Sequence, residues 1–290
     1  MAGIQDPLTE LPPPSRLDFE ELGNFTLDAS SAPPPAFISW DANVEFETPL
    51  RPRLLFIASS PSGLHLISHL PEKRLLGSVV LPAEDQSDEG SSKGSLSDDG
   101  NIKGRSVYDA RNPRKQSVHT CNVYALDGEH ASVIMVAVQT PIAEERANTW
   151  ARAVLEAIAA DRVMVVTMLQ REHYRGKLSA DDEVIFRLET DALRLEKLGK
   201  EEATMGHDDD VPYFPSGSIV SGFPAAVLTR CQLLGLKGRL LLSWPESRSS
   251  APSLLVTILN RFPDIQCLDF SSSLQVPFKG KSVSDLEIYM

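Results

Sequence analysis

The chain of 290 residues has few cysteines, few basic residues and no long apolar run, and each shortage excludes a class of protein. Its three cysteines, Cys121, Cys231 and Cys267, are far apart and lie in largely apolar sequence, without the spacing of a zinc site. They are typical of reduced thiols in a protein of the cytosol or the nucleus. We therefore expect neither a disulfide framework nor a metal centre.

Basic residues are scarce, with 28 Lys and Arg against 40 Asp and Glu, which gives a formal net charge of -12. Nucleic acid and anionic membrane surfaces repel such a chain, so we expect neither as its main partner. Apolar runs such as Val133 to Val138 are much shorter than the roughly 20 residues that cross a bilayer. The first residues, MAGIQDPLTELPPP, lack the basic start and the apolar run of a secretory signal, so we expect no export.

Motifs for catalysis are missing as well. Ser59 to Gly63 follow a predicted buried strand, where α/β folds place phosphate loops and nucleophile elbows. Neither G-x-S-x-G nor G-x-x-x-x-G-K-[ST] occurs there, so we interpret these residues as a strand-to-helix connection with serine caps. The apolar neighbours of Cys231 are of the kind that raises the pKa of a thiol and blunts its reactivity. We expect no catalytic site and no cofactor.

Two histidines, His65 and His69, have the i, i+4 spacing that places both imidazoles on one helical face. A zinc site needs a third ligand, and the zincin pattern needs a glutamate directly after the first histidine, where Leu66 stands. We therefore interpret them as ordinary, partly exposed histidines rather than as metal ligands.

Prolines, serines and acids mark the segments outside the predicted domain. Residues 1–50 form a proline-rich arm that we expect to be mostly disordered, with Trp40 and its apolar neighbours docking locally. Residues 83–114 form a disordered insertion, acidic first and basic towards its end. It is either a target of an acid-directed kinase at Ser95 and its neighbours or a solvated loop without a role. Residues 270–290 form a flexible C-terminal tail.

Residues 51–269 alternate apolar runs with helical patterns, which predicts a single α/β domain. We expect an open, mixed and largely parallel sheet with helices on both faces. A turn at Asp127-Gly128 predicts an antiparallel hairpin, and residues 184–188 fit either a strand or the start of a helix. The predicted strands cover residues 53–58, 75–81, 118–126, 131–138, 163–169 and 240–242, and the predicted helices cover residues 64–70, 142–160, 193–198 and 224–234. A final predicted helix is capped by Ser249 or Ser250 and ended by Pro263.

From Gly222 to Trp244 the sequence predicts a helix, a tight turn and a buried strand. Pro224 suits the first helical turn, and Gly235 supplies a residue that can turn left-handed after the last one. A turn at Lys237-Gly238 then leads into Leu240 to Leu242, an apolar run without alternation, which is typical of a parallel strand covered on both faces. The helical face that we expect to be buried consists of Val227, Cys231 and Leu234.

The sequence ends in Leu286-Glu287-Ile288-Tyr289-Met290. An apolar side chain, a tyrosine and a free carboxylate on a flexible segment can enter a lysine-bearing pocket together. From Phe270 such a tail reaches at most about 60 Å when fully extended and roughly 25 Å as a coil. The alternative is a frayed end without a partner.

Two stretches resemble a known family. Phe223 to Trp244, with P-A-A-V-L at Pro224 to Leu228 followed by Cys231-Gln232 and a short turn into an apolar strand, resembles the corresponding segment of proteasome assembly chaperones. Ile288-Tyr289-Met290 is similar to the hydrophobic-tyrosine-any-residue tail, the HbYX motif, of this family and of proteasome activators. The rest of the chain agrees mainly in element order, and the arm and the insertion are not part of the pattern.

The resemblance implies a non-enzymatic chaperone of the cytoplasm or nucleus, with a phosphorylase-like three-layer architecture. It implies a heterodimer with proteasome assembly chaperone 2, a distant homologue, that binds assembling rings of alpha-type subunits. In that family the tail occupies a pocket between neighbouring alpha subunits, so Ile288 would anchor the tail, Tyr289 would pack beside the pocket wall and the carboxylate of Met290 would meet a lysine. The alternatives are a small-molecule hydrolase or phosphorylase-like α/β enzyme, and an acidic adaptor whose insertion is the active part.

Overall fold

A computed structural model of the chain describes residues 34–41, 49–82, 119–126, 132–179, 182–198, 211–244, 252–263, 265 and 268–278. Those from Pro35 onward belong to one compact unit. Several predictions fall outside the described residues: most of the 1–50 arm, the 83–114 insertion with Ser95, Cys267, and the end of the tail with Ile288, Tyr289 and Met290.

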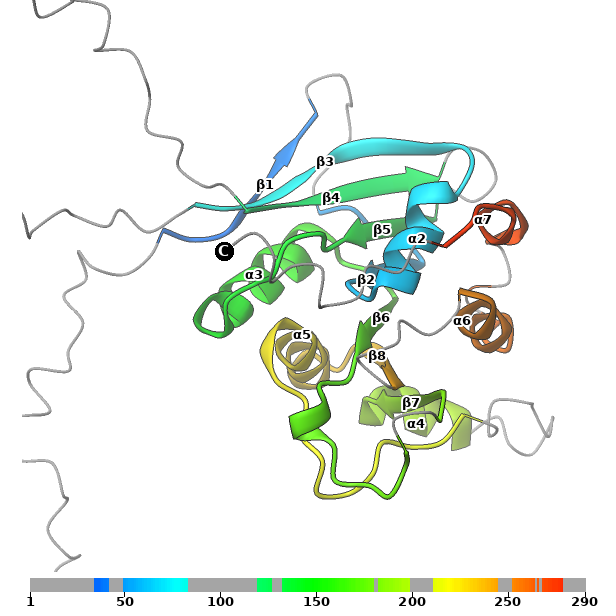
Figure 1. Ribbon diagram of the computed structural model, residues 1–290. Helices are drawn as coiled ribbons and strands as arrows, with labels where there is room; N and C mark the ends of the chain where they lie inside the picture. Colours follow the sequence, from blue (N-terminus) through cyan, green and yellow to red (C-terminus); the bar gives the residue numbers. More distant parts are fainter. Residues whose placement is uncertain are drawn as a thin grey trace, which may run out of the picture. The chain divides into compact units, whose positions relative to one another are not determined.

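Apolar runs of the sequence lie side by side as the parallel centre of one eight-stranded sheet (Figure 1). The strands are β1 (Phe37–Trp40), β2 (Leu54–Ala58), β3 (Lys73–Leu81), β4 (His119–Leu126), β5 (Val133–Ala137), β6 (Arg162–Met168), β7 (Val184–Glu189) and β8 (Lys237–Trp244). Their order across the sheet is β1-β3-β4-β5-β2-β6-β8-β7. The neighbours β5, β2, β6 and β8 run parallel, whereas every pair nearer to an edge is antiparallel. The mixed sheet and the antiparallel pairing of β4 with β5 are as predicted, whereas the predicted turn at Asp127-Gly128 lies outside the described residues.

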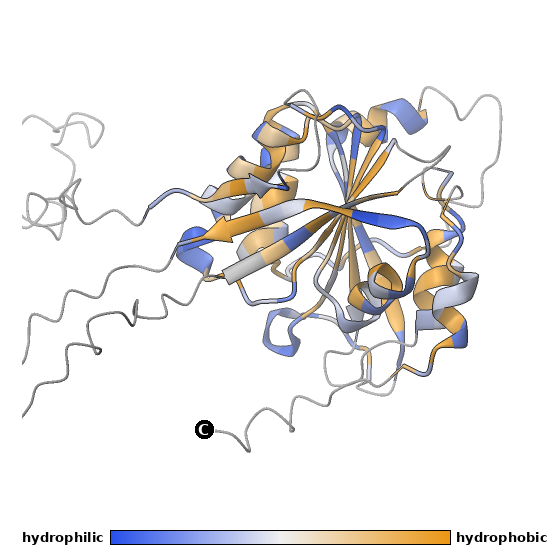
Figure 2. Cartoon of the chain, turned by 90° about the horizontal axis from the view of Figure 1, so that it is seen from above, coloured by the Kyte–Doolittle hydropathy of each residue, from blue (hydrophilic) through white to orange (hydrophobic). Residues whose placement is uncertain are grey.

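Burial on both faces explains why the central strands show no polar alternation. All five residues of β2 are buried. Leu55 and Ile57 belong to the apolar core on one face of the sheet, and Leu54 and Phe56 belong to the core on the other face. Figure 2 shows this concentration of hydrophobic residues along the strands at the centre of the molecule.

Helices cover both faces of the sheet and complete the three predicted layers. The helices are α2 (Pro61–His69), α3 (Glu144–Ala157), α4 (Asp191–Leu198), α5 (Gly222–Leu233), α6 (Pro252–Leu259) and α7 (Ser271–Gln275), with a 3-10 turn, η2, at Arg171–His173. Buried residues of α3 and α5 lie in one core, and those of α2 and α6 lie in the other. The helix α7 packs against α2, and α4 packs against β8 (Figure 1). None of the helices in the described part of the chain combines the length and the apolar character that crossing a membrane requires.

The predicted helix, turn and strand between Gly222 and Trp244 form α5 and β8. Gly235 follows the helix with a φ of 66°, the left-handed conformation expected of it. The N–H of Leu236 donates to the carbonyl of Cys231 at 2.8 Å, and that of Gly235 donates to Gln232 at 3.2 Å, which is the bond pattern of a Schellman motif. Because this motif completes the turn, β8 already begins at Lys237, and the predicted turn at Lys237-Gly238 is wrong.

One predicted core position is also wrong. Val227 and Cys231 are fully buried as expected, but Leu234 is 53% exposed. Leu234 is the residue that caps α5, so it has left the helical repeat that places Val227 and Cys231 on the inner face. Residues 184–188, for which a strand and the start of a helix were both open, belong to the strand β7 (Val184–Glu189), and the helix α4 follows it.

Two described segments outside the predicted domain of residues 51–269 form secondary structure. Phe37–Trp40 lies within the proline-rich arm, where we expected Trp40 and its apolar neighbours to dock locally, and it pairs with β3 as an edge strand and also contacts α3. At the other end, the tail was predicted to be flexible from Phe270, whereas Ser271–Gln275 forms α7 on the surface of α2. In both cases tertiary packing orders a segment whose own sequence has little periodicity.

Candidate functional site

The connection from β2 into α2 is shorter than the predicted segment Ser59 to Gly63, because α2 already begins at Pro61. The hydroxyl of Ser59 donates to Oγ1 of Thr167 at 2.9 Å, which ties the end of β2 to β6. The side chain of Ser60 accepts a hydrogen bond from the N–H of Gly63 at 3.1 Å and caps the helix, as predicted for a serine there. These hydroxyls hold secondary-structure elements together, and their hydrogen bonds give no sign of a nucleophile paired with a base.

His65 and His69 lie on the same face of α2, with ring centroids 4.3 Å apart. Nε2 of His65 lies 3.0 Å from the carbonyl oxygen of Ser273, and Nδ1 of His69 lies 2.9 Å from the carbonyl oxygen of His65. A carbonyl only accepts, so both nitrogens carry a proton and donate. Within the described ranges, no three His, Cys, Asp or Glu side chains lie close enough together to share a metal ion.

Cys231 and Cys121 are fully buried free thiols. Burial raises the pKa of Cys231 to about 12 and that of Cys121 to about 11. A thiol with such a pKa is almost entirely protonated near neutral pH and is a poor nucleophile. Both side chains therefore serve as core residues.

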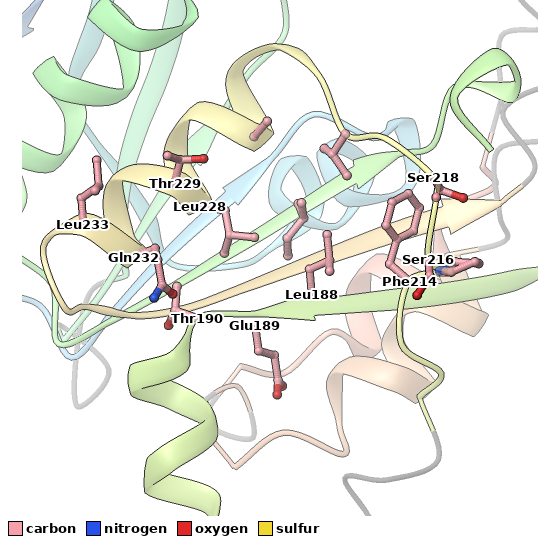
Figure 3. Close-up of a pocket in the computed structure, with 15 residues that line it drawn as sticks. Leu188, Glu189, Thr190, Phe214, Ser216, Ser218, Leu228, Thr229, Gln232 and Leu233 are labelled. Atoms are coloured by element: carbon pink, nitrogen blue, oxygen red, sulfur yellow. The ribbon is translucent and has the colours of Figure 1, made fainter. Parts of the chain in front are cut away.

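A groove of about 540 Å³ lies on the outer side of α5 (Figure 3). One wall is the helix, the opposite wall is the segment 214–220, and the floor comes from β7 and β8. We call it the α5 groove; its apolar lining consists of Leu188, Phe214, Pro215, Val220, Ala225, Leu228, Leu233 and Leu240. Polar groups at its edges are the hydroxyls of Ser216, Ser218 and Thr229 and the amide of Gln232 (Figure 3).

Backbone hydrogen bonds to β7 hold the second wall of the groove in place. The N–H of Arg187 donates to the carbonyl of Pro212 at 2.9 Å, and the N–H of Phe214 donates to the carbonyl of Arg187 at 3.0 Å. Further along, the N–H of Ile219 donates to the carbonyl of His173 at 3.0 Å. The wall therefore covers part of the outer edge of β7, a sheet edge that would otherwise offer unpaired backbone groups.

Gln232 connects the end of α5 to the start of α4. Its Oε1 accepts from the N–H of Asp191 at 2.9 Å, and its Nε2 donates to the Asp191 carboxylate at 2.8 Å. The N–H of Asp191 is one of the donors that the first turn of α4 cannot satisfy internally, so Gln232 acts as a cap from another helix. Thr190, between β7 and α4, donates to the carbonyl of Leu236 at 2.8 Å and accepts from Gly238 at 2.9 Å. These hydrogen bonds fix the end of the groove where α5, α4 and β8 meet.

Glu189 is among the residues that line the groove, but strand alternation turns its charged side chain away from it. Leu188 points towards α5, whereas its neighbour Glu189 points to the other side of β7 (Figure 3). There Arg239 and Lys197 donate to Oε1 of Glu189 at 2.8 Å and 2.7 Å. Burial alone raises the pKa of the Glu189 carboxyl, but the two cations outweigh it and hold that pKa below its ordinary value.

Large apolar side chains extend from the groove into solvent. Leu233 on the helix is 79% exposed, and Ile219 within the opposite wall is 58% exposed. An uncharged, mainly apolar groove with such an edge suits the apolar side chains of another protein rather than a charged small molecule.

Sequence reasoning missed this groove, although α5 carries a signal for it. Ala225, Leu228 and Leu233 are apolar and lie away from the fully buried side that carries Val227 and Cys231. A helix that is apolar on more than one side packs against a second partner. The opposite wall gives no such signal, because residues 214–220 are placed by their pairing with β7. The predicted site residues Ile288, Tyr289 and Met290 lie outside the described residues, which reach 278.

No family model matches this sequence, and no curated protein matches it. Solved structures do resemble it. PbaA from Pyrococcus furiosus, an archaeal homologue of proteasome-assembly chaperone, is 16% identical, with 83% of this chain and 87% of that chain covered and a TM-score of 0.49. A Thermoplasma acidophilum protein of unknown function is 12% identical, with 84% and 87% covered and a TM-score of 0.48. PbaB from Pyrococcus furiosus, an archaeal proteasome activator, is 13% identical, with 83% and 93% covered and a TM-score of 0.49.

Proposed function

We propose that this chain is a proteasome assembly chaperone that acts by binding, without catalysis, in the cytosol or nucleus. In this proposal it takes the role of proteasome assembly chaperone 1. It forms a heterodimer with proteasome assembly chaperone 2, and the pair promotes assembly of the ring of alpha-type proteasome subunits. The C-terminal Ile288, Tyr289 and Met290 enter a pocket between neighbouring alpha subunits.

The α5 groove is the structural observation that supports a binding function most directly. Exposure of apolar side chains to water at a groove is unfavourable, and a protein partner that covers them removes this surface from water and so gains binding free energy. Leu233 extends furthest into solvent and can become an anchor at the centre of such a contact. We therefore place the heterodimer contact at the α5 groove.

The tail supports the second half of the proposal. Ile288, Tyr289 and the carboxylate of Met290 supply an apolar group, an aromatic ring with a hydroxyl and a negative charge within three residues. Such a short motif buries little area, so its own binding is weak and gains strength only from a second contact of the same molecule. A chaperone that must leave the finished particle benefits from two weak contacts.

Co-expression with proteasome assembly chaperone 2 tests the heterodimer and the groove together. We expect the two chains to co-purify at equal stoichiometry and the pair to unfold at a higher temperature than this chain alone. Leu233→Glu places a charge at the groove and should weaken pairing at least tenfold without changing the stability of the isolated chain, because the side chain is 79% exposed. The matched control is Leu75→Glu on β3, far across the sheet from β7, where the native leucine is 42% exposed.

The two substitutions separate a local contact from a general loss of solubility. Pairing should survive Leu75→Glu and fail in Leu233→Glu. Equal pairing of both variants with the partner would show that the heterodimer contact lies away from the α5 groove. A chain that remains a stable monomer in the presence of its proposed partner would contradict the heterodimer itself.

A further inference from the structure

We propose that α7 and Phe278 fix the base of the C-terminal tail onto α2, so that Ser272, Ser273, His65 and Phe278 are positioning residues for the tail. This inference rests on the proposed binding of the tail to the proteasome. We call the contact between these residues and the last turn of α2 the tail anchor.

Serine hydroxyls of α7 satisfy carbonyl groups at the end of α2. The last four carbonyls of a helix have no partner within it. In α2 these belong to Leu66, Ile67, Ser68 and His69. Ser273 donates to the carbonyl of Leu66 at 3.2 Å, and Ser272 donates to that of His69 at 3.3 Å.

Local groups satisfy the other two carbonyls of this turn. The N–H of Leu70 donates to Ile67, and Nζ of Lys73 donates to Ser68. All four acceptors are therefore used, and α7 supplies the donors for two of them. The anchor completes α2 in the way that a C-cap does, rather than merely lying on its surface.

His65 holds the anchor from the opposite direction. Its Nε2 donates to the carbonyl of Ser273 at 3.0 Å, so Ser273 is bonded to α2 through both its hydroxyl and its backbone. The ring of Phe278 meets the His65 ring edge to face, with centroids 5.2 Å apart. Ser273 is completely buried, which protects these bonds from competition by water.

The anchor shortens the part of the chain that can reach a partner. Residues 279–290 follow Phe278, so twelve residues separate the anchor from the end of the tail, against twenty counted from Phe270. The shorter tether spans about 40 Å when extended and about 20 Å as a coil. Effective concentration falls roughly as the −3/2 power of tether length, so release of the anchor should lower it about twofold. Because α2 follows the central strand β2, the starting point of the tether is fixed relative to the sheet.

Amide hydrogen exchange of the full-length chain tests the anchor without any partner. In the double variant Ser272→Ala, Ser273→Ala, the amide of Leu274 should exchange about tenfold faster, since two hydrogen bonds to α2 are lost. The control is Ser271→Ala on the same helix. The Ser271 hydroxyl bonds to Asp269 instead of α2, so exchange at Leu274 in this variant should stay within about twofold of the parent chain. Unchanged exchange in the double variant would overturn the inference.

Affinity for assembled alpha rings then tests whether the anchor serves the tail. The measurement uses the chain together with its partner, in four forms: the parent, the double serine variant, a form lacking Ile288, Tyr289 and Met290, and the double variant lacking the same three residues. We expect the double variant to bind about twofold more weakly when the tail is present and no further loss when the tail is absent.

The outcomes separate the two proposals. If removal of the tail weakens binding but the double variant binds like the parent, the anchor does not position the tail, and the inference is wrong while the proposed function stands. If removal of the tail changes nothing, the proposed role of the tail is wrong, and with it the positioning role that we assign to the anchor.

Discussion

Arg239 donates a hydrogen bond from Nε to the carboxylate of Glu189 at 2.8 Å, and the two residues are register partners across β8 and β7. The side chain of Glu189 is fully buried and that of Arg239 is 4% exposed. Lys197 of α4 donates to the same carboxylate oxygen, and the guanidinium of Arg239 lies 3.7 Å from the ring centroid of Phe262. The pair therefore joins the edge strand, α4 and the segment after α6.

Removal of the carboxylate should destabilise the protein strongly. In Glu189→Ala the buried guanidinium of Arg239 loses this carboxylate, and we expect a loss of about 3–5 kcal/mol in the free energy of unfolding. Denaturation in urea measures it. The control is Glu156→Ala, which removes an exposed carboxylate paired with Arg152 and Arg230 and should cost less than about 1 kcal/mol. Similar losses in the two variants would show that the buried Glu189–Arg239 pair contributes no more to the free energy of unfolding than an exposed pair does.

The same carboxyl predicts a dependence of stability on pH. The pKa of Glu189 is lowered in the folded protein, so its ionised form stabilises the fold at pH values above its unfolded pKa of about 4.3. That contribution is lost as the pH falls towards the lower, folded pKa. The difference in unfolding free energy between the parent chain and Glu189→Gln should be constant from about pH 6 to 8 and should shrink below about pH 4.3. A difference that grows on acidification would contradict this sign.

The left-handed glycine after α5 gives a third prediction. Gly235 has a φ of 66°, where an added Cβ is strained although no neighbouring atom is in its way. Gly235→Ala should lower the free energy of unfolding by about 1 kcal/mol, and Gly235→Asn should lower it less, because asparagine tolerates this conformation better. Thermal unfolding of the three proteins checks the order. An alanine variant as stable as the parent would show that the Schellman motif does not constrain this turn.

The buried thiols should be unreactive in the folded protein. With pKa values of about 12 for Cys231 and about 11 for Cys121, both should resist iodoacetamide at pH 8 for as long as the chain is folded. Peptide mass mapping before and after denaturation measures the labelling at each position. Rapid alkylation of Cys231 in the native chain would mean that α5 opens readily from β8.

The sequence predicted the centre of the sheet well because its strands are buried on both faces. Such strands are uniform apolar runs, as in residues 54–58 and 240–242, and neither needs a distant partner to be recognised. The helix and turn at Cys231 and Gly235 were also predictable, because capping chemistry is local. Ser60 was predictable as a cap for the same reason.

The edge strands of the sheet and the α5 groove could not be predicted from local sequence patterns. Phe37–Trp40 becomes a strand only because β3, more than thirty residues later, offers it an edge. The wall 214–220 follows from hydrogen bonds to Arg187, and Ser273 acquires its role from Leu66, 207 positions earlier in the chain. These contacts join segments whose own sequences show no periodicity, so no local sequence pattern predicts the contacts.

The role of the C-terminal tail is the central claim, and removal of Ile288, Tyr289 and Met290 tests it most directly. The chain should be produced together with proteasome assembly chaperone 2, with and without these residues, and its co-fractionation with alpha-ring intermediates should be measured by quantitative immunoblotting. We predict that the heterodimer still forms and that association with the intermediates falls at least several-fold, with Tyr289→Ala close to the deletion. Undiminished association of both variants would contradict the proposed mechanism.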